Sequence, residues 1–136
     1  MDYPKVGLVF MTHEVRNDLK YTETHEWVRV KGRVIQVGIT DHAQSQLTDI
    51  VYVELPEVGK KVKKGEELCV VESVKSVSDV YSPVTGTVIK VNKKVEDNPE
   101  IINSSPYDEG WLVEIEADNS SEINNLLDAE KYKKIT

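Results

Sequence analysis

Short apolar runs alternate with turn residues along most of the chain. Residues 27–30 and 34–37 form two such runs that flank Lys31-Gly32, where glycine tolerates the positive φ of a tight turn, so they predict a β-hairpin. A β-branched and aromatic run at residues 50–55 ends at Pro56, which cannot donate to a strand ladder. Further strands are expected at residues 68–72, 77–81, 87–91 and 111–116. The pattern predicts a mainly β fold, a flattened β-sandwich or small barrel.

Two segments carry helical signals instead. Thr40 occupies an N-cap position before residues 41–47, which predict a short internal helix. Near the C-terminus, Ser120 or Ser121 is expected to cap a second helix. Its residues recur at helical spacing and give one stripe that we expect to pack on the sheet. The stripe comprises Ile123, Leu126, Leu127 and Glu130.

An internal repeat suggests that the β fold has two quasi-symmetric halves. Residues 62–68 (VKKGEEL) and 95–101 (VEDNPEI) share Val, then Gly or Asn, then Glu, then Leu or Ile at equal offsets. Gly and Asn are the residues that best tolerate a left-handed backbone, so the match concerns geometry as well as spelling. The repeat predicts that Val62 and Val95 occupy equivalent places, although turn motifs of this length also recur by chance.

Lys75 lies between the two predicted halves, at the tip of a predicted hairpin. The tip contains no Gly, Asn or Asp, and it places the apolar Val74 beside the lysine. An apolar side chain at an exposed tip suggests recognition by another protein. The simpler interpretation is a solvated lysine on a turn, which holds for most lysines.

Composition and charge narrow the function classes. The 136 residues suit one domain, and 39% hydrophobic with 30% charged residues is a soluble globular composition. A net charge of -7 argues against nucleic acid or an anionic membrane as the main partner, so protein partners are expected. The single cysteine, Cys69, excludes an intrachain disulfide and is expected to be a buried strand thiol. The three histidines are scattered along the sequence and suggest no metal site.

Residues 1–18 do not fit the β pattern. The apolar run at residues 6–11 is too short to span a bilayer, and the acids around it do not suit a targeting leader. We therefore treat residues 1–18 as an N-terminal extension of unknown role and residues 19–136 as the domain.

A lysine at a hairpin between two similar β-halves resembles the biotinyl and lipoyl carrier domains. Biotin carriers place methionine on each side of the lysine, and lipoyl domains of 2-oxoacid dehydrogenases usually place Asp before it, whereas this chain has Val74 and Ser76. The run ESVKSVSDVYSPVTG at residues 72–86 instead resembles the signature of glycine cleavage H proteins. The resemblance extends to YTETHEW, GITDHAQ, VYVELPEVG and INSSPYDEGWL, in the right order. It covers nearly all of residues 19–136, while residues 1–18 depart from it.

The resemblance implies a lipoyl-domain-like fold and a carrier function without catalysis. Lys75 would hold lipoate through a covalent amide, and the protein would carry an aminomethyl group in glycine catabolism and one-carbon metabolism. The implied partners are glycine decarboxylase (a pyridoxal-phosphate enzyme), the tetrahydrofolate-dependent aminomethyltransferase, dihydrolipoamide dehydrogenase and a lipoate-attaching enzyme. A monomer in the cytoplasm, or in the mitochondrial matrix of a eukaryote, is expected. The chemistry would belong to the cofactor and the partner enzymes.

Four more residues are candidates for sheltering or recognising the arm. Glu26, together with Thr24, matches the family motif where polar groups are thought to shelter the loaded amine, and a carboxylate there could pair with a cation. Glu72 and Asp79 flank Lys75 and could be read by the lipoate-attaching enzyme or touch the amine. Each could equally be an ordinary strand-start or solvated residue.

Two other functions stay open. A lipoyl relay that donates lipoate to 2-oxoacid dehydrogenase complexes would use the same Lys75. An interaction module that kept the fold without the cofactor is also possible in principle, because fold does not fix function. An enzyme with its own active site is disfavoured, since no nucleophile, base and orienting group occur together in the sequence.

Overall fold

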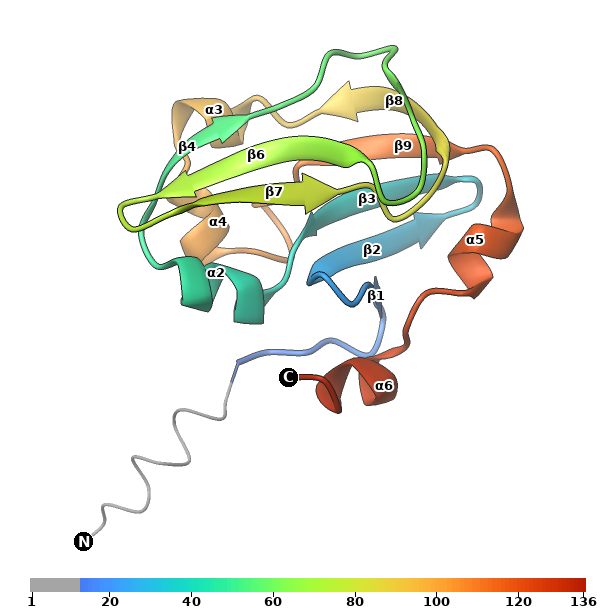
Figure 1. The fold of residues 1–136 in the computed structure, drawn as a ribbon, viewed down its shortest axis with the longest axis horizontal. Coiled ribbons are helices and arrows are strands. Elements are labelled where there is room, and N and C mark those ends of the chain that lie inside the picture. Colours follow the sequence, from blue (N-terminus) through green and yellow to red (C-terminus); the bar gives the residue numbers. More distant parts are fainter. Residues whose placement is uncertain (1–12) are drawn as a thin grey trace, which may run out of the picture.

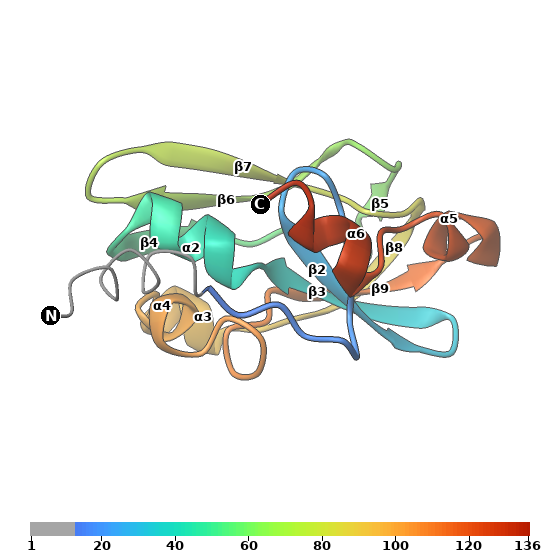
Figure 2. The same cartoon turned by 90° about the horizontal axis from the view of Figure 1, so that it is seen from below.

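The strands form two sheets that pack face to face in the computed structural model, which describes residues 13–136. A six-stranded sheet has the order β1-β2-β3-β9-β8-β5, and a three-stranded sheet has the order β4-β6-β7. Figure 1 looks onto the three-stranded sheet, and Figure 2 shows both sheets side on. The strands are β1 (Lys20–Tyr21), β2 (Glu26–Lys31), β3 (Val34–Ile39), β4 (Ile50–Glu54), β5 (Lys61–Val62), β6 (Glu67–Ser73), β7 (Val77–Tyr81), β8 (Gly86–Val91) and β9 (Val113–Ala117). The helices are α2 (Asp41–Leu47), α3 (Lys94–Asp97), α4 (Ile101–Ser104), α5 (Ser120–Asn124) and α6 (Ala129–Lys133).

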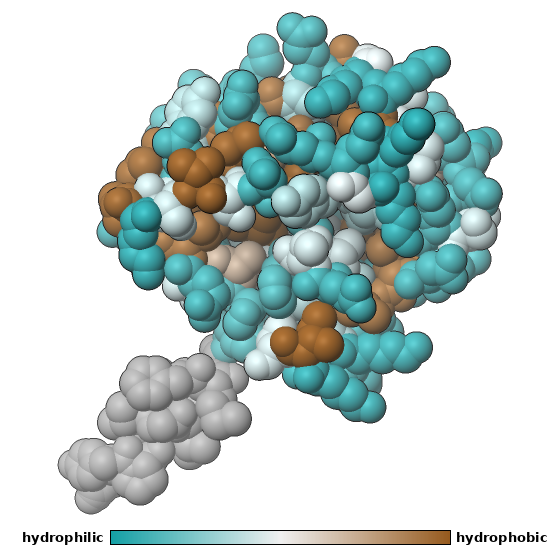
Figure 3. Space-filling view, viewed as in Figure 1, coloured by the Kyte–Doolittle hydropathy of each residue, from teal (hydrophilic) through white to brown (hydrophobic). Residues whose placement is uncertain are grey.

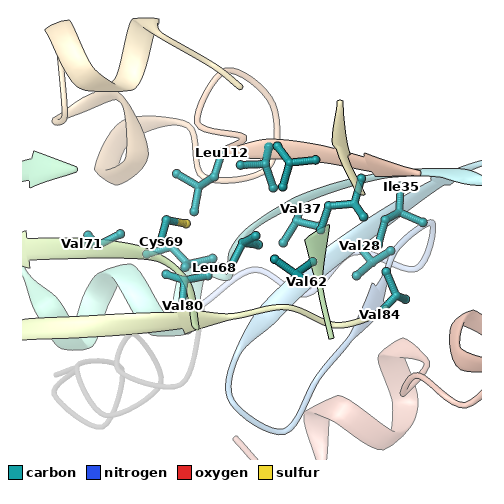
Figure 4. Packing of buried hydrophobic residues seen from close by; sticks show 14 of the residues in the cluster. Val28, Ile35, Val37, Val62, Leu68, Cys69, Val71, Val80, Val84 and Leu112 are labelled. Atoms are coloured by element: carbon teal, nitrogen blue, oxygen red, sulfur yellow. The ribbon is translucent and has the colours of Figure 1, made fainter. Parts of the chain in front are cut away.

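This arrangement confirms the mainly β prediction, and of its two forms the flattened sandwich fits. Aliphatic side chains from both sheets fill the space between them, as Figure 4 shows. Val28 and Val37 come from the larger sheet, and Val71 and Val80 come from the smaller one; all four are almost fully buried. Burying such side chains contributes about 1.5–3 kcal/mol each before chain entropy is counted, so this core is the main source of stability.

A second, aromatic cluster lies beside β1 and β2. Tyr21 stacks on Tyr132 with ring centroids 4.4 Å apart, and the Trp27 indole donates to the Pro106 carbonyl at 2.8 Å. Trp27 is directly opposite Gly38 in the β2–β3 pair, where an added Cβ would come within 2.6 Å of the indole. Glycine is therefore required at residue 38 by the close approach of the ring.

The predicted hairpin and internal helix are confirmed. β2 and β3 pair in antiparallel register around Gly32, whose φ of +68° suits glycine. The Thr40 side chain accepts a hydrogen bond from the Ala43 backbone N–H and so caps α2. The other predicted strands also form, each within two residues of the expected bounds.

The two segments of the internal repeat differ in local structure. Val62 lies in β5 and is followed by a turn with Gly65 at φ +88°, whereas Val95 lies in the helix α3. Asn98 has φ −136°, so it does not adopt the left-handed backbone that its match to Gly65 suggested. Both valines are buried, so each segment needs an apolar residue at this position.

The expected C-terminal helix is divided into two. Asn119, not Ser120 or Ser121, caps α5, and Asp128 caps α6 through the Lys131 backbone N–H. Between them, Leu127 forms a reciprocal backbone bridge with Tyr21, with both N–H···O distances at 2.8 Å. That bridge removes Leu127 from helical hydrogen bonding, so one continuous helix cannot form.

The described end of the N-terminal extension lies against the domain. The Glu14 backbone N–H donates to the Asp41 carboxylate at 2.7 Å, and the Arg16 side chain pairs with Asp18 and Asp108. The apolar run at residues 6–11 lies outside the described residues. Among residues 13–136, no helix is both long enough and apolar enough to cross a membrane.

Candidate functional site

Lys75 lies in the turn between β6 and β7, at the end of a hairpin that extends along one side of the molecule (Figure 1). Ser73 builds this turn without glycine. Its hydroxyl oxygen accepts from the backbone N–H groups of Lys75 and Ser76, both at 3.1 Å, and its own N–H donates to the Ser76 carbonyl at 2.8 Å. The Val74 N–H donates to the Asp49 carbonyl at 3.0 Å. The backbone around Lys75 is therefore held firmly by hydrogen bonds within the turn and by one to the Asp49 carbonyl.

The side chains of this turn point into solvent. Lys75 is exposed, and Val74 and Val77 on either side expose 65% and 64% of their surface. Among residues 13–136, the Lys75 ammonium has no hydrogen-bond or ion-pair partner. An exposed primary amine on a four-carbon stem, mounted on a fixed turn, fits the chemistry of amide attachment to a carboxylic cofactor. The exposed position of Lys75 agrees with the sequence-based expectation.

Glu26 lies in a very different environment at the start of β2. It is only 2% exposed, and its carboxylate accepts from the Thr24 hydroxyl at 2.5 Å, from the Thr22 hydroxyl, and from the Tyr81 backbone N–H at 3.0 Å. Burial raises the pKa of the Glu26 carboxyl, while these hydrogen bonds to its charged form act in the opposite direction. Thr24 and Glu26 are thus brought together, as the motif suggested.

A cavity of about 490 Å³ opens beside Glu26. Its wall is formed by both polar and apolar groups: Thr24 and Glu26 contribute oxygen atoms, and Tyr81, Leu126 and Leu127 contribute apolar surface. Tyr81 is the last residue of β7, so this strand leads from the Lys75 turn to the cavity. The cavity therefore combines an apolar wall with a buried carboxylate.

Glu72 and Asp79 lie apart from this cavity. Glu72 is half-buried on β6 opposite Val77, and Asp79 is exposed on β7 opposite Val70. Neither carboxylate has a side-chain hydrogen bond or ion pair within residues 13–136, and neither lines the cavity. The four tentative residues therefore form two groups, a buried pair and a surface pair.

Sequence reasoning missed several structural contributors. Ser73 supports the turn and Thr22 holds the Glu26 carboxylate, through the hydrogen bonds described above. The absence of glycine from the tip was the signal in the sequence that a side chain supports the turn.

The three histidines are scattered in sequence but lie together in the structure. The ring centroids of His25 and His42 are 4.7 Å apart, and those of His13 and His42 are 4.8 Å apart. Within the described part of the chain, no group of three or more His, Cys, Asp or Glu residues could hold a metal ion.

Cys69 is buried in β6, as predicted, and burial raises the pKa of its thiol. A thiol that is both inaccessible and protonated is a poor nucleophile. It therefore belongs to the core and takes no part in the site.

The fold and the exposed tip lysine define a carrier domain of the biotinyl and lipoyl type, in which a β-sandwich presents a lysine on a hairpin. Comparison with known proteins then gives the family. Residues 19–136 match the glycine cleavage H-protein family. The chain is 53% identical over 120 residues to a glycine cleavage system H protein of Alteromonas mediterranea, covering 88% of this chain and 93% of the relative. It is 55% identical over 119 residues to that of Symbiobacterium thermophilum, with the same coverage.

A solved structure agrees with these relatives. The crystal structure of a glycine cleavage system H protein from Mycobacterium marinum superposes with a TM-score of 0.82 at 36% sequence identity, covering 88% of this chain and 97% of that one. The chain belongs to the glycine cleavage H-protein family. It is accordingly a lipoyl-bearing carrier in the glycine cleavage system and not a catalyst.

Proposed function

We propose that Lys75 is the residue that carries the lipoyl group, through an amide on its Nζ. The observation that carries this proposal is the exposed lysine on the turn that Ser73 fixes, whose ammonium has no partner among residues 13–136. In the acylation, the Nζ lone pair attacks the carbonyl carbon of an activated lipoyl donor. The bond from that carbon to the leaving group breaks, and the amine loses a proton to base. The dithiolane of the attached lipoyl group then supplies the redox and group-carrying chemistry.

The proposed role is to carry an aminomethyl group from glycine decarboxylase to the tetrahydrofolate-dependent aminomethyltransferase. Dihydrolipoamide dehydrogenase and a lipoate-attaching enzyme complete the proposed set of partners. A tethered group stays at high effective concentration beside whichever enzyme is docked, so a small carrier can serve several active sites in turn.

The cavity beside Glu26 is the proposed shelter for the carried amine. An aminomethyl nitrogen is cationic at neutral pH, and a buried carboxylate beside an apolar wall would hold it and exclude water. Thr24 and Thr22 already hold the Glu26 carboxylate in place. Asp79 and Glu72, which lie outside the cavity, are proposed to act at the surface, in recognition of the protein.

The remaining assignments complete the proposal. Residues 19–136 form the carrier domain, and residues 1–18 form an extension whose role is open. The protein acts as a monomer in the cytoplasm, or in the mitochondrial matrix if its source is a eukaryote.

Labelled glycine tests the carrier role. We expect the lipoylated protein to gain label from the glycine methylene carbon in the presence of glycine decarboxylase, and to lose it once aminomethyltransferase and tetrahydrofolate are added. Lys75→Arg should gain none, whereas the control Lys90→Arg, changed in β8, should behave as the wild type. Transfer of lipoate to a dehydrogenase lipoyl domain, without labelling from glycine, would favour the relay function instead.

A further inference from the structure

The outer face of the three-stranded sheet is exposed and lies next to Lys75. Apart from the register irregularities at the start of β4 and of β6, side chains alternate along these strands, so that Val53, Val71 and Val80 point into the core while their neighbours point outward. Strand register places the outward residues in two rows across the sheet. The rows are Tyr52, Glu72 and Val77, nearest the turn, and Glu54, Val70 and Asp79 behind them. Glu67, exposed at the start of β6 opposite Tyr81, lies at the end of the face farthest from the turn.

The charged residues of the three strands are all acidic. The strands β4, β6 and β7 contain the acids Glu54, Glu67, Glu72 and Asp79 and no lysine or arginine. Among residues 13–136, none of these four carboxylates has a cationic partner. The six-stranded sheet differs, because its strands carry the cations Lys20, Arg29, Lys31, Lys61 and Lys90, and its Glu114 pairs with Lys31 at 3.3 Å.

Apolar side chains are interspersed with the acids on the same face. Tyr52 exposes 49% of its surface and Val77 exposes 64%. Figure 3 views this side of the molecule and shows apolar residues gathered at the end where the hairpin turn lies, among hydrophilic ones. Exposed aromatic and aliphatic groups gathered on one face are typical of a surface that another protein covers.

We propose that this face is the docking surface of the lipoate-attaching enzyme, which meets it with a basic and partly apolar surface. The inference rests on Lys75 being the acylated residue. An enzyme that acylates the Nζ must hold the protein itself close to the tip, because no arm exists yet for it to grasp. The four carboxylates then attract and orient a cationic surface, and Tyr52 and Val77 supply apolar contact.

Charge also disfavours the other occupants of this face. A second copy docked by two-fold symmetry would bring the same four carboxylates against one another, which costs free energy. The phosphates of nucleic acid would be repelled for the same reason. A basic protein surface is the partner that the face complements.

Charge reversal away from the tip tests the proposal. Glu54→Lys/Glu67→Lys changes two acids of the face and leaves the 72–79 segment intact, and Glu116→Lys is the control, an exposed strand glutamate of the other sheet. With a lipoate–protein ligase, lipoate and ATP, we expect the KM for the double variant to rise about tenfold at low salt with kcat within about twofold of wild type. The rise should shrink at about 0.5 M salt, where exposed charges are screened. The control should match the wild type.

The outcomes separate this inference from the proposed function. Lipoylation of the wild type at a residue other than Lys75 would overturn the proposed function and this inference with it. Wild-type lipoylation at Lys75 with equal KM values for all three proteins would overturn the docking surface alone. If the lysine variant fails to fold by circular dichroism, Glu54→Gln/Glu67→Gln replaces it, with a smaller rise expected and an unchanged KM again contradicting the inference. Light scattering that shows a wild-type dimer, broken by the same changes, would assign the face to self-association and overturn it too.

Discussion

Lys75 and Glu26 lie at opposite ends of β7, in opposite environments. β7 begins just after the Lys75 turn and ends at Tyr81, whose backbone N–H donates to the Glu26 carboxylate. The Lys75 turn exposes its side chains and fixes only its backbone, through Ser73. The Glu26 segment buries its side chain and satisfies it with hydroxyls and a backbone N–H, against the aromatic cluster around Trp27. This contrast fits the two proposed roles, because attachment of the arm needs access for another enzyme, whereas sheltering a labile group needs exclusion of water. Changes at the two places should therefore have different consequences.

The largest expected effect is on stability and lies on the buried side. Trp27→Ala should lower the free energy of unfolding by about 3–5 kcal/mol, because it removes a fully buried indole and its hydrogen bond. Val74→Ala at the exposed tip should change it by less than about 0.5 kcal/mol. Urea denaturation of the two variants measures both values. Similar losses would remove the contrast between the two regions.

A second prediction concerns retention of the carried group. Glu26→Gln keeps the shape and removes the charge, and the Thr22 and Thr24 hydroxyls can turn to accept from the new amide. A charge-assisted hydrogen bond is worth about 1.5–3 kcal/mol, so we expect the aminomethyl group to be lost to water about tenfold faster or more. The decay of loaded protein is followed by mass spectrometry without aminomethyltransferase. Equal decay rates would leave Glu26 as a structural residue.

A third prediction concerns the turn. Ser73→Ala removes the acceptor of two backbone N–H groups and should cost about 1–2 kcal/mol of unfolding free energy. Lipoylation should also slow, because Lys75 is then held less firmly. Ser76→Ala is the matched control, since the Ser76 hydroxyl has no hydrogen-bond partner among the described residues. A Ser73 variant that is as stable and as readily lipoylated as the control would show that the turn needs no side-chain support.

The smallest expected effect is a dependence of the unfolding free energy on pH, caused by His25 and His42. Burial and neighbouring imidazoles lower the pKa of His25 and of His42. The unfolded chain therefore binds more protons than the folded one as the pH falls below the ordinary value of about 6.5, and the unfolding free energy should decrease there. The raised pKa of Glu26 acts with the opposite sign at lower pH, because its folded form retains the proton more readily. His42→Gln should flatten the decrease in denaturation curves measured between about pH 7 and 5.5, whereas Glu26→Gln should leave it in place.

Local patterns predicted those parts of the fold whose residues interact with near neighbours. Gly32 and Thr40 signalled the β2–β3 hairpin and α2, because turn and cap chemistry is read within a few residues. The two repeat segments differ in local structure, although each contains a buried valine, because an apolar residue is needed equally in β5 and in α3. The prediction of a single C-terminal helix was wrong because the backbone bridge between Leu127 and Tyr21 joins residues far apart in sequence. A local sequence pattern contains no information on such a contact.

The site was predictable to a similar extent. The exposed position of Lys75 on a turn followed from its place between two predicted strands, and its proposed role follows from the motif around it. The role of Ser73 as the support of the turn, and the cavity between Glu26, Tyr81 and the Leu126–Leu127 segment, depend on tertiary contacts. The opposed environments of Glu26 and Asp79 could not be read from the sequence, since both are acids next to β residues.

Peptide mapping of the lipoylated wild type tests the central claim most directly. After incubation with a lipoate–protein ligase, lipoate and ATP, tryptic peptides analysed by mass spectrometry should show the lipoyl mass only on the peptide that contains Lys75. The Lys75→Arg protein should gain no lipoyl mass under the same conditions, because arginine lacks the acylable amine. A lipoyl group on another lysine, or a mass gain in Lys75→Arg, would contradict the account.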